Sequence, residues 1–264
     1  MQQQAFSPIF QTWPLWAASA LQYPSELWGL QPAITFLEES IVRPGHVVAD
    51  LGCGEGFSAA LIASMVGTKG KVIGIDVSDQ SLARTASYRA IHNLTFQKGD
   101  VAKKLPLETE SVDVATCFMV CHMLKCAELQ RMFKEMSRVL KPGGQAVLLT
   151  MHPKAFELDW ELAFLQYNPN AVSRLRSISE KEGTVIPLVE RSLGGIETKT
   201  LVTHHTRRTM VRAAERHGLG HVPDNEQHLW IDPKTAAEKY GPDAVLKRPD
   251  VATYWLNTYR KRAS

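Results

Sequence analysis

The chain has 264 residues and a mass of 29.4 kDa, and 44% of its residues are hydrophobic, enough to fill the core of one large domain or two small ones. This composition excludes a disordered chain and a disulfide-stapled miniprotein. Its 30 basic and 27 acidic residues leave a formal net charge of +3, which does not demand a nucleic-acid partner.

The first 20 residues have no basic segment, and prolines interrupt their apolar residues, which indicates neither a signal peptide nor a membrane anchor. Aromatic residues are frequent up to residue 30, and Pro32–Val42 has the spacing of an amphipathic helix. We expect this lead to pack on the rest of the domain or to cover a ligand as an apolar lid. The aromatic candidates for the lid are Trp13, Trp16, Tyr23 and Trp28.

From residue 45 to residue 150, short β-branched runs alternate with turn residues and with stretches of helical period, which is typical of a parallel α/β sheet. The expected helices are Phe57–Val66, Asp79–His92 and Ala127–Leu140, the last ended by Pro142, Gly143 and Gly144. The expected strands are His46–Leu51, Lys71–Asp76, Leu94–Lys98, Ser111–Cys117 and Gln145–Met151.

The chain after the fifth strand follows a different pattern. Residues 153–195 fit the sheet rhythm poorly, so we expect an inserted cap there. Thr198–His205 alternates like a strand, so only one of His204 and His205 is expected to face the core. A helix is expected over Arg207–His217, and both Gly220–Trp230 and Val251–Tyr259 can close the sheet.

A glycine-rich turn follows the first expected strand. Gly52, Gly54 and Gly56 stand at alternate positions, where side chains would block the approach of a ligand to the backbone. Asp76 ends the second strand, where a carboxylate can accept both hydroxyls of a ribose. Asp100 follows the third, where it can accept from the exocyclic amine of an adenine. One nucleoside would thus contact three successive loops.

The spacing of this turn distinguishes it from a dinucleotide site. A site for pyrophosphate uses Gly-x-Gly-x-x-Gly, whereas here the pattern is Gly-x-Gly-x-Gly after Asp50. The charge of Asp50 would repel a phosphate and attract an ammonium group, which favours a nucleoside that carries an amino acid. The alternative interpretation is that the glycines only make a turn between a strand and a helix.

These motifs resemble the class I S-adenosylmethionine-dependent methyltransferases of small-molecule type, over about residues 34–150. The resemblance rests on Asp50–Gly56, Gly74–Asp76, Gly99–Val101 and Glu135–Gly144. It implies that Asp50 and the glycine turn hold the methionine moiety, Asp76 the ribose and Asp100 with Val101 the adenine, with Cys117–His122 at the reacting end. The cofactor-binding residues expected in total are Asp50, Gly52, Cys53, Gly54, Gly56, Asp76, Val77, Gly99, Asp100, Val101, Cys117 and Phe118.

The expected architecture is one domain with a doubly wound, mostly parallel sheet of seven strands, the Rossmann-like methyltransferase fold. Residues 1–44 would be the N-terminal lead, 45–152 the cofactor-binding core, 153–196 the cap and 197–264 the strands and helix that complete the sheet. No metal site is expected, because ligand spacing is missing. Four cysteines without paired spacing predict free thiols and a cytoplasmic location.

Two histidines are candidates for contact with the acceptor or for taking its proton. His122 follows the fourth strand and His152 the fifth, at the edge where open α/β sheets place their sites. Methyl transfer can also proceed by alignment and exclusion of water without a base, and either histidine can instead be structural.

We therefore expect an enzyme that moves a methyl group from S-adenosylmethionine to nitrogen, oxygen or carbon of a small molecule and releases S-adenosylhomocysteine. Two alternatives remain: transfer or cyclisation of the aminocarboxypropyl group, which releases methylthioadenosine, and a non-catalytic binding platform. No membrane or nucleic-acid partner is expected, and the protein would be a monomer or homodimer. The expected helix with Arg207, Arg208, Arg212 and Arg216 is the only hint of RNA binding, and a solvated face also explains it.

Overall fold

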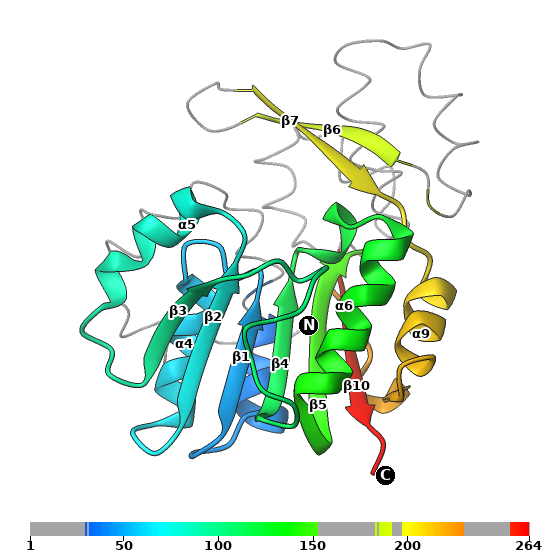
Figure 1. Ribbon diagram of the computed structural model, residues 1–264. Helices are drawn as coiled ribbons and strands as arrows, with labels where there is room; N and C mark the ends of the chain where they lie inside the picture. The colour runs from blue at the N-terminus through cyan, green and yellow to red at the C-terminus, as the bar shows by residue number, and fades with distance from the viewer. Residues whose placement is uncertain are drawn as a thin grey trace, which may run out of the picture.

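The computed structural model describes residue 30 and residues 32–152, 183, 185–191, 197–229 and 254–263. Within these residues, eight strands form one mixed sheet in the order β3-β2-β1-β4-β5-β10-β8, and β9 also pairs with β10 (Figure 1). The seven strands of the main path agree with the expected architecture. The strands are β1 (Val47–Leu51), β2 (Lys71–Asp76), β3 (Leu94–Lys98), β4 (Val112–Phe118), β5 (Leu140–Met151), β8 (Leu219–His221), β9 (Gln227–Leu229) and β10 (Tyr254–Lys261).

The first five strands are parallel, so their carboxyl ends meet at one edge of the sheet. β10 runs antiparallel to β5, β8 and β9, which brings its first residue, Tyr254, beside Met151 at that same edge. The edge therefore collects the loops after β1 to β5 together with the start of β10.

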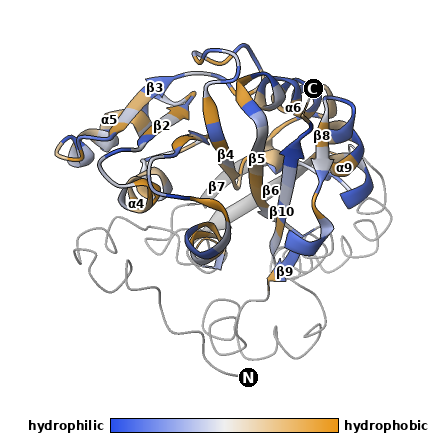
Figure 2. Ribbon diagram, turned by 90° about the horizontal axis from the view of Figure 1, so that it is seen from below, coloured by the Kyte–Doolittle hydropathy of each residue, from blue (hydrophilic) through white to orange (hydrophobic). Residues whose placement is uncertain are grey.

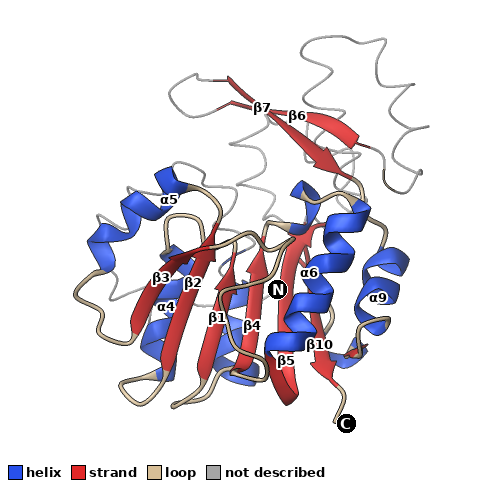
Figure 3. Ribbon diagram, viewed as in Figure 1, coloured by secondary structure: helices blue, strands red, loops and turns tan. Residues whose placement is uncertain are grey.

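Helices cover both faces of the sheet, as Figure 3 shows. One face carries α4 and the helix of residues 32–36, which continues into a π-helical turn, η1; the other face carries α6 and α9. In Figure 2 apolar colouring marks the central strand β4 between these layers. The helices are η1 (Leu37–Ile41), α4 (Phe57–Val66), α5 (Asp79–Arg84), η2 (Thr85–Tyr88), η3 (Cys121–Met123), α6 (Cys126–Val139), α9 (Arg207–Glu215) and η4 (Pro223–Asn225).

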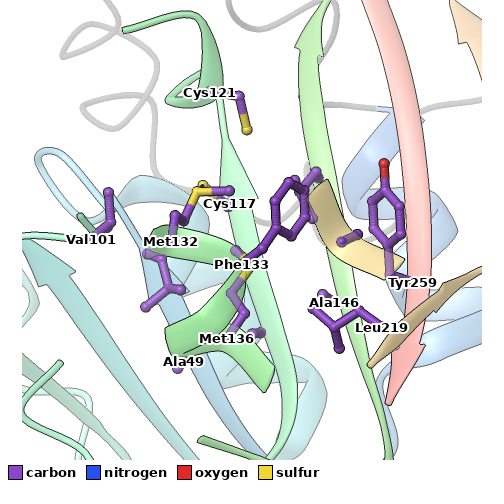
Figure 4. Close-up of a cluster of buried hydrophobic side chains, with 14 of the residues drawn as sticks. Ala49, Val101, Cys117, Cys121, Met132, Phe133, Met136, Ala146, Leu219 and Tyr259 are labelled. Atoms are coloured by element: carbon purple, nitrogen blue, oxygen red, sulfur yellow. Dashed lines mark hydrogen bonds between the residues drawn. The ribbon is translucent and has the colours of Figure 1, made fainter. Parts of the chain in front are cut away.

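The spacing of apolar residues explains the packing of α6. Leu129, Met132, Phe133 and Met136 recur at intervals of three and four and are buried against the sheet. Figure 4 shows Phe133 among the side chains of this cluster, and its ring packs edge-on against Tyr259 of β10 at a centroid distance of 5.5 Å. This layer fixes the sheet from which the loops at the carboxyl edge project.

A separate two-stranded sheet consists of β6 (Val185–Arg191) and β7 (Glu197–Thr203). This hairpin lies beyond the carboxyl edge in Figure 1, and β7 contacts η3. The expected boundary between the cap and the C-terminal part, at residue 196, falls between the two strands of this hairpin. Strand β6 lies in the expected cap and β7 in the expected C-terminal part. Residues 1–29 and 153–182, which hold the aromatic lid candidates and most of the expected cap, lie outside the described residues.

One expected helix end is wrong and a second agrees with the structure. The helix expected over Asp79–His92 stops at Arg84 and continues as η2, where the hydroxyls of Thr85 and Ser87 donate to carbonyls three residues back and compete with helical bonding. The α6 helix ends at Val139, within one residue of the expected end at Leu140. The residues before Pro142 are disfavoured as helix, and β5 begins directly at Leu140 with a register shift against β4.

The expectation for the histidine pair is also wrong. His204 and His205 are both buried, with 4% and 8% of their surface exposed. Strand β7 ends at Thr203 and Thr206 caps α9, so the pair lies in a connection where strand alternation does not apply. Among the described residues, no helix is long and apolar enough to cross a bilayer.

Candidate functional site

The glycine turn after β1 is held against β2 by backbone hydrogen bonds. The amides of Gly52 and Cys53 both donate to the carbonyl of Ile75, at 2.7 and 3.1 Å. Gly52, Gly54 and Gly56 have φ angles of 74°, 54° and 90°, in the left-handed region that favours glycine. A Cβ on Gly52 would lie 2.3 Å from Val120 Cγ2, whereas one on Gly54 would meet nothing within 4 Å. The turn thus presents bare backbone at Gly54, as a ligand cradle requires.

Asp76 connects the end of β2 to this turn. Its Oδ2 accepts from the amide of Gly54 and its Oδ1 from the amide of Ser78, both at 2.8 Å. Each carboxylate oxygen has a second lone pair, so these bonds leave acceptor capacity for two ribose hydroxyls. Asp76 therefore orders the cradle and remains the predicted ribose ligand.

Asp100 lies one strand further along the edge. It stands two residues after Lys98, the register partner of Asp76, and its Oδ1 accepts from the amide of Ala102 at 2.9 Å. Val101 is buried, whereas 62% of Val77 is exposed, so Val77 offers apolar surface beside the two acids. The turn, Asp76 and Asp100 therefore adjoin one another at the carboxyl edge.

Asp50 is placed differently from the other two acids. Only 1% of its surface is exposed, and its carboxylate accepts from Ser58 Oγ and Thr116 Oγ1, both at 2.6 Å. Burial raises the pKa of Asp50, and the two hydroxyl donors oppose this shift. Asp50 thus ties β1 to β4 and α4 beneath the turn, and its contact with the methionine moiety stays a prediction.

Ser58 and Thr116 are site-supporting residues that the sequence analysis did not identify. Thr116 is the register partner of Asp50 on β4, and Ser58 stands at the start of α4, eight residues after Asp50. Asp50 and Thr116 are polar residues within otherwise mostly apolar strands. Once β1 and β4 are known to be neighbours, this shared polarity is the signal that pairs them.

The segment after β4 forms the expected reacting end. Cys117, Phe118 and Cys121 are buried, and hydrogen bonding to Cys121 followed by burial raises the pKa of the Cys117 thiol. Met119 has a positive φ of 57°, which is uncommon outside glycine and is found preferentially at functional sites. Its amide donates to the carbonyl of Leu149 at 2.8 Å, which holds this strained turn beside β5.

His122 lies on η3, directly after this turn, and is buried. Burial, followed by the nearby His205, lowers the pKa of His122 to about 4. The Nε2 atom of His205 lies 2.7 Å from the carbonyl of Leu124, so this nitrogen carries the proton and donates it. The His122 ring is therefore neutral near neutral pH, a state in which it can accept a proton.

We expect the stability of the protein to fall as pH falls from 6.5 to about 4 because of His122. Within this window the unfolded state binds the proton that the folded state excludes, at a cost of up to about 3 kcal/mol in the free energy of unfolding. Urea unfolding across this range measures the loss, and His122→Gln should flatten the curve. An identical pH dependence in the wild type and the variant would contradict this account.

His152 follows the last residue of β5, at the edge of the sheet that also carries the glycine turn. It is partly buried, and its ring lies 5.2 Å from the ring of His228, measured between centroids. The aromatic lid candidates Trp13, Trp16, Tyr23 and Trp28 lie outside the described residues. Among the described residues, no group of three or more His, Cys, Asp or Glu side chains can hold a metal ion.

The residues at this edge fit S-adenosylmethionine. The cofactor has a nucleoside, an amino acid and a sulfonium, and the edge offers two partly exposed acids, an exposed valine and a backbone cradle at Gly54 where even a methyl group would find open space. The apolar segment after β4 lies directly against the glycine turn. Val120 of this segment occupies the space that a side chain on Gly52 would need. The acids suit hydroxyls and amines, and the apolar segment suits a desolvated cation.

Comparisons with known proteins show which proteins this chain resembles. Residues 48–144 match a family described as a methyltransferase domain. The chain is 38% identical over 118 residues to a 2-phytyl-1,4-naphtoquinone methyltransferase of Synechococcus elongatus, an alignment that spans 43% of this chain and 49% of the relative. The chain thus spans about half the length of this curated relative.

Solved structures share the fold. An S-adenosylmethionine-dependent methyltransferase from Mesorhizobium loti aligns with a TM-score of 0.59 and 20% identity, over 88% of this chain and 97% of that one. A geranyl diphosphate C-methyltransferase from Streptomyces coelicolor A3(2), solved with S-adenosyl-L-homocysteine, aligns with a TM-score of 0.58 and 19% identity, over 88% and 76%. Residues 48–144 of this chain therefore match a methyltransferase domain, and the chain has the fold of solved S-adenosylmethionine-dependent methyltransferases.

Proposed function

We propose that the protein transfers a methyl group from S-adenosylmethionine to nitrogen, oxygen or carbon of a small molecule. The observation that carries this proposal is the meeting of the glycine turn, Asp76 and Asp100 on adjoining loops of a methyltransferase domain. The cofactor supplies a methyl group on a positively charged sulfur, which becomes a neutral thioether when the acceptor forms the new bond.

The chain's own residues would bind and orient the reactants. Asp76, ordered by the amides of Gly54 and Ser78, would fix the ribose, and the bare backbone at Gly54 would receive the amino-acid end. The hairpin β6–β7 beyond the carboxyl edge would help to exclude water from the acceptor. The acceptor itself would lie over the ends of β4 and β5, near His122 and His152.

A match to a small-molecule methyltransferase supports a small-molecule acceptor rather than a nucleic acid. The four cysteines, all among the described residues, form no disulfide, which supports a reducing compartment such as the cytoplasm. A monomer or homodimer is consistent with this function, because the proposed cofactor ligands all lie on one chain.

Mass spectrometry of the products tests the proposal. The purified chain would be incubated with S-adenosylmethionine and one test acceptor at a time. Two test acceptors, reduced 2-phytyl-1,4-naphthoquinone and geranyl diphosphate, are taken from the names of similar proteins. Pooled metabolite extracts would be tested in the same way. We expect S-adenosylhomocysteine together with an acceptor heavier by one methylene. Release of methylthioadenosine would instead show aminocarboxypropyl chemistry, and tight cofactor binding with neither product would show a binding platform.

A further inference from the structure

A buried carboxylate gathers charged and polar groups at the β10 side of the sheet. Glu226 lies between η4 and β9, and only 9% of its side chain is exposed. Arg207 donates to both carboxylate oxygens, from Nε at 2.7 Å and from Nη2 at 2.6 Å, and Trp255 Nε1 donates to Oε1 at 2.9 Å. His221 Nε2 and His228 Nε2 lie 3.4 and 3.5 Å from its oxygens.

His228 extends this cluster to the end of β5. It is the register partner of Trp255, which pairs in turn with Thr150 of β5. His152 directly follows Met151, the last residue of β5 and the register partner of Tyr254 on β10. The rings of His152 and His228 accordingly lie 5.2 Å apart across β10. Glu226, His228 and His152 thus form a row that runs from β9 to the carboxyl edge.

The row ends beside the proposed reaction centre. The Gly52 turn adjoins Val120 after β4, and Met119 of the same segment bonds to Leu149 of β5, three residues before His152. Neighbouring strands lie about 4.8 Å apart, so β5 is two strand spacings, about 10 Å, from the glycine turn. An acceptor between the cofactor's methyl group and His152 would fit this interval.

We infer that His152 accepts the proton that the acceptor loses, and that His228 and Glu226 are positioning residues that stabilise the resulting imidazolium. This inference rests on the proposed function. Each methyl group replaces one proton of an O–H, N–H or C–H group on the acceptor, and the new bond uses the electron pair that this proton leaves behind. The proton passes to a ring nitrogen of His152 and then, through His228, whose side chain is 43% exposed, to solvent.

The charges that face the row decide its proton affinity. Glu226 is ionised at neutral pH, because the hydrogen bond from Arg207 holds the pKa of this carboxyl below its usual range. Arg207 comes from α9 and His221 from β8, while the described residues of β10 contribute the buried Trp255 and Tyr259. The Arg207–Glu226 pair is neutral as a whole, so removing either member exposes the histidines to the charge of the other.

Removing either member of the Arg207–Glu226 pair should therefore shift the titration midpoint of His152, in opposite directions for the two variants. In the full chain labelled at histidine, NMR would follow the ring signals of His152 against pH. Glu226→Gln leaves the Arg207 charge uncompensated, so the midpoint for His152 should move to lower pH, whereas Arg207→Gln leaves the carboxylate charge and should move it to higher pH. His92→Gln, on an exposed loop far along the chain, should move nothing.

Shifts of equal sign, or none, would overturn the inference. Should Glu226→Gln fail to fold, Arg207→Gln and His228→Gln keep the test decisive, because both side chains are about half exposed. In that case an unchanged His152 midpoint in these two variants would contradict the coupling.

Kinetics test the proton transfer itself, with an acceptor found by the product assay. His152→Ala should lower kcat about 100-fold or more with an unchanged KM for S-adenosylmethionine, and added imidazole should restore part of the rate. A folded His152→Ala variant with wild-type kcat, or a loss that imidazole does not restore, would refute the inference. Calorimetry with S-adenosylhomocysteine tests the proposed function separately from the role of His152. A wild type that does not bind this ligand would contradict the proposed function, whatever the histidine signals show.

Discussion

Asp76→Ala is expected to weaken the binding of S-adenosylhomocysteine by about 1.5 to 3 kcal/mol, or roughly 10- to 150-fold. The substitution removes the predicted acceptor of the ribose hydroxyls and also frees the Gly54 and Ser78 amides that the carboxylate orders. Charge-assisted hydrogen bonds are the stronger class, so their loss should dominate over the small change in buried area. Equilibrium dialysis with labelled S-adenosylhomocysteine measures the dissociation constant.

A matched carboxylate provides the control for this prediction. Asp113 on β4 also accepts from a backbone amide, that of Val47, and pairs with Lys141, but at the opposite, amino-terminal edge of the sheet. Asp113→Ala should therefore lower stability and leave the dissociation constant unchanged. Equal binding in the wild type and Asp76→Ala, or equal losses in the two variants, would remove Asp76 from the site.

Gly52→Ala is expected to lower the free energy of unfolding by about 2 to 5 kcal/mol. Its φ of 74° costs a side chain roughly 1 to 2 kcal/mol, and the new Cβ would lie 2.3 Å from Val120 Cγ2. Valine is stiff at this position, so the backbone must move, at a typical cost of about 1 to 3 kcal/mol. The same movement displaces the turn and should abolish S-adenosylhomocysteine binding.

Gly143→Ala isolates the backbone contribution. Gly143 has a comparable φ of 78°, but a Cβ there would meet nothing within 4 Å, and it lies in β5 far from the carboxyl edge. Urea unfolding of both variants should show a loss of only about 1 to 2 kcal/mol for Gly143→Ala, with ligand binding kept. Losses of the same size at both positions would show that the contact with Val120 has no energetic weight.

The core of the fold was predictable because its signals are local. Lys71–Asp76, Leu94–Lys98 and Phe57–Val66 have the expected bounds, since an apolar run flanked by turn residues determines each of them. The mostly parallel sheet with helices on both faces is confirmed as well, and residues 48–144, which contain the motifs around the glycine turn, match a methyltransferase domain. The assignment of individual residues to ligand groups stays a prediction.

The features that the sequence analysis missed depend on contacts between distant segments. The hydrogen bonds from Ser58 and Thr116 to Asp50 require β1, β4 and α4 to be in place. The cluster around Glu226 brings together α9, β8, β9 and β10, and strands of three residues carry no periodic signal of their own. The burial of both His204 and His205 likewise follows from the end of β7 at Thr203. Alternation of apolar and polar residues in the sequence does not show where a strand ends.

Isothermal titration of the full chain with S-adenosylhomocysteine tests the central claim most directly, namely that the loops after β1, β2 and β3 together bind this nucleoside. The account predicts saturable binding of one ligand per chain, in contrast to free adenosine, which lacks the amino-acid end and should bind more weakly. Absence of heat at millimolar S-adenosylhomocysteine, from a chain shown to be folded, would contradict it.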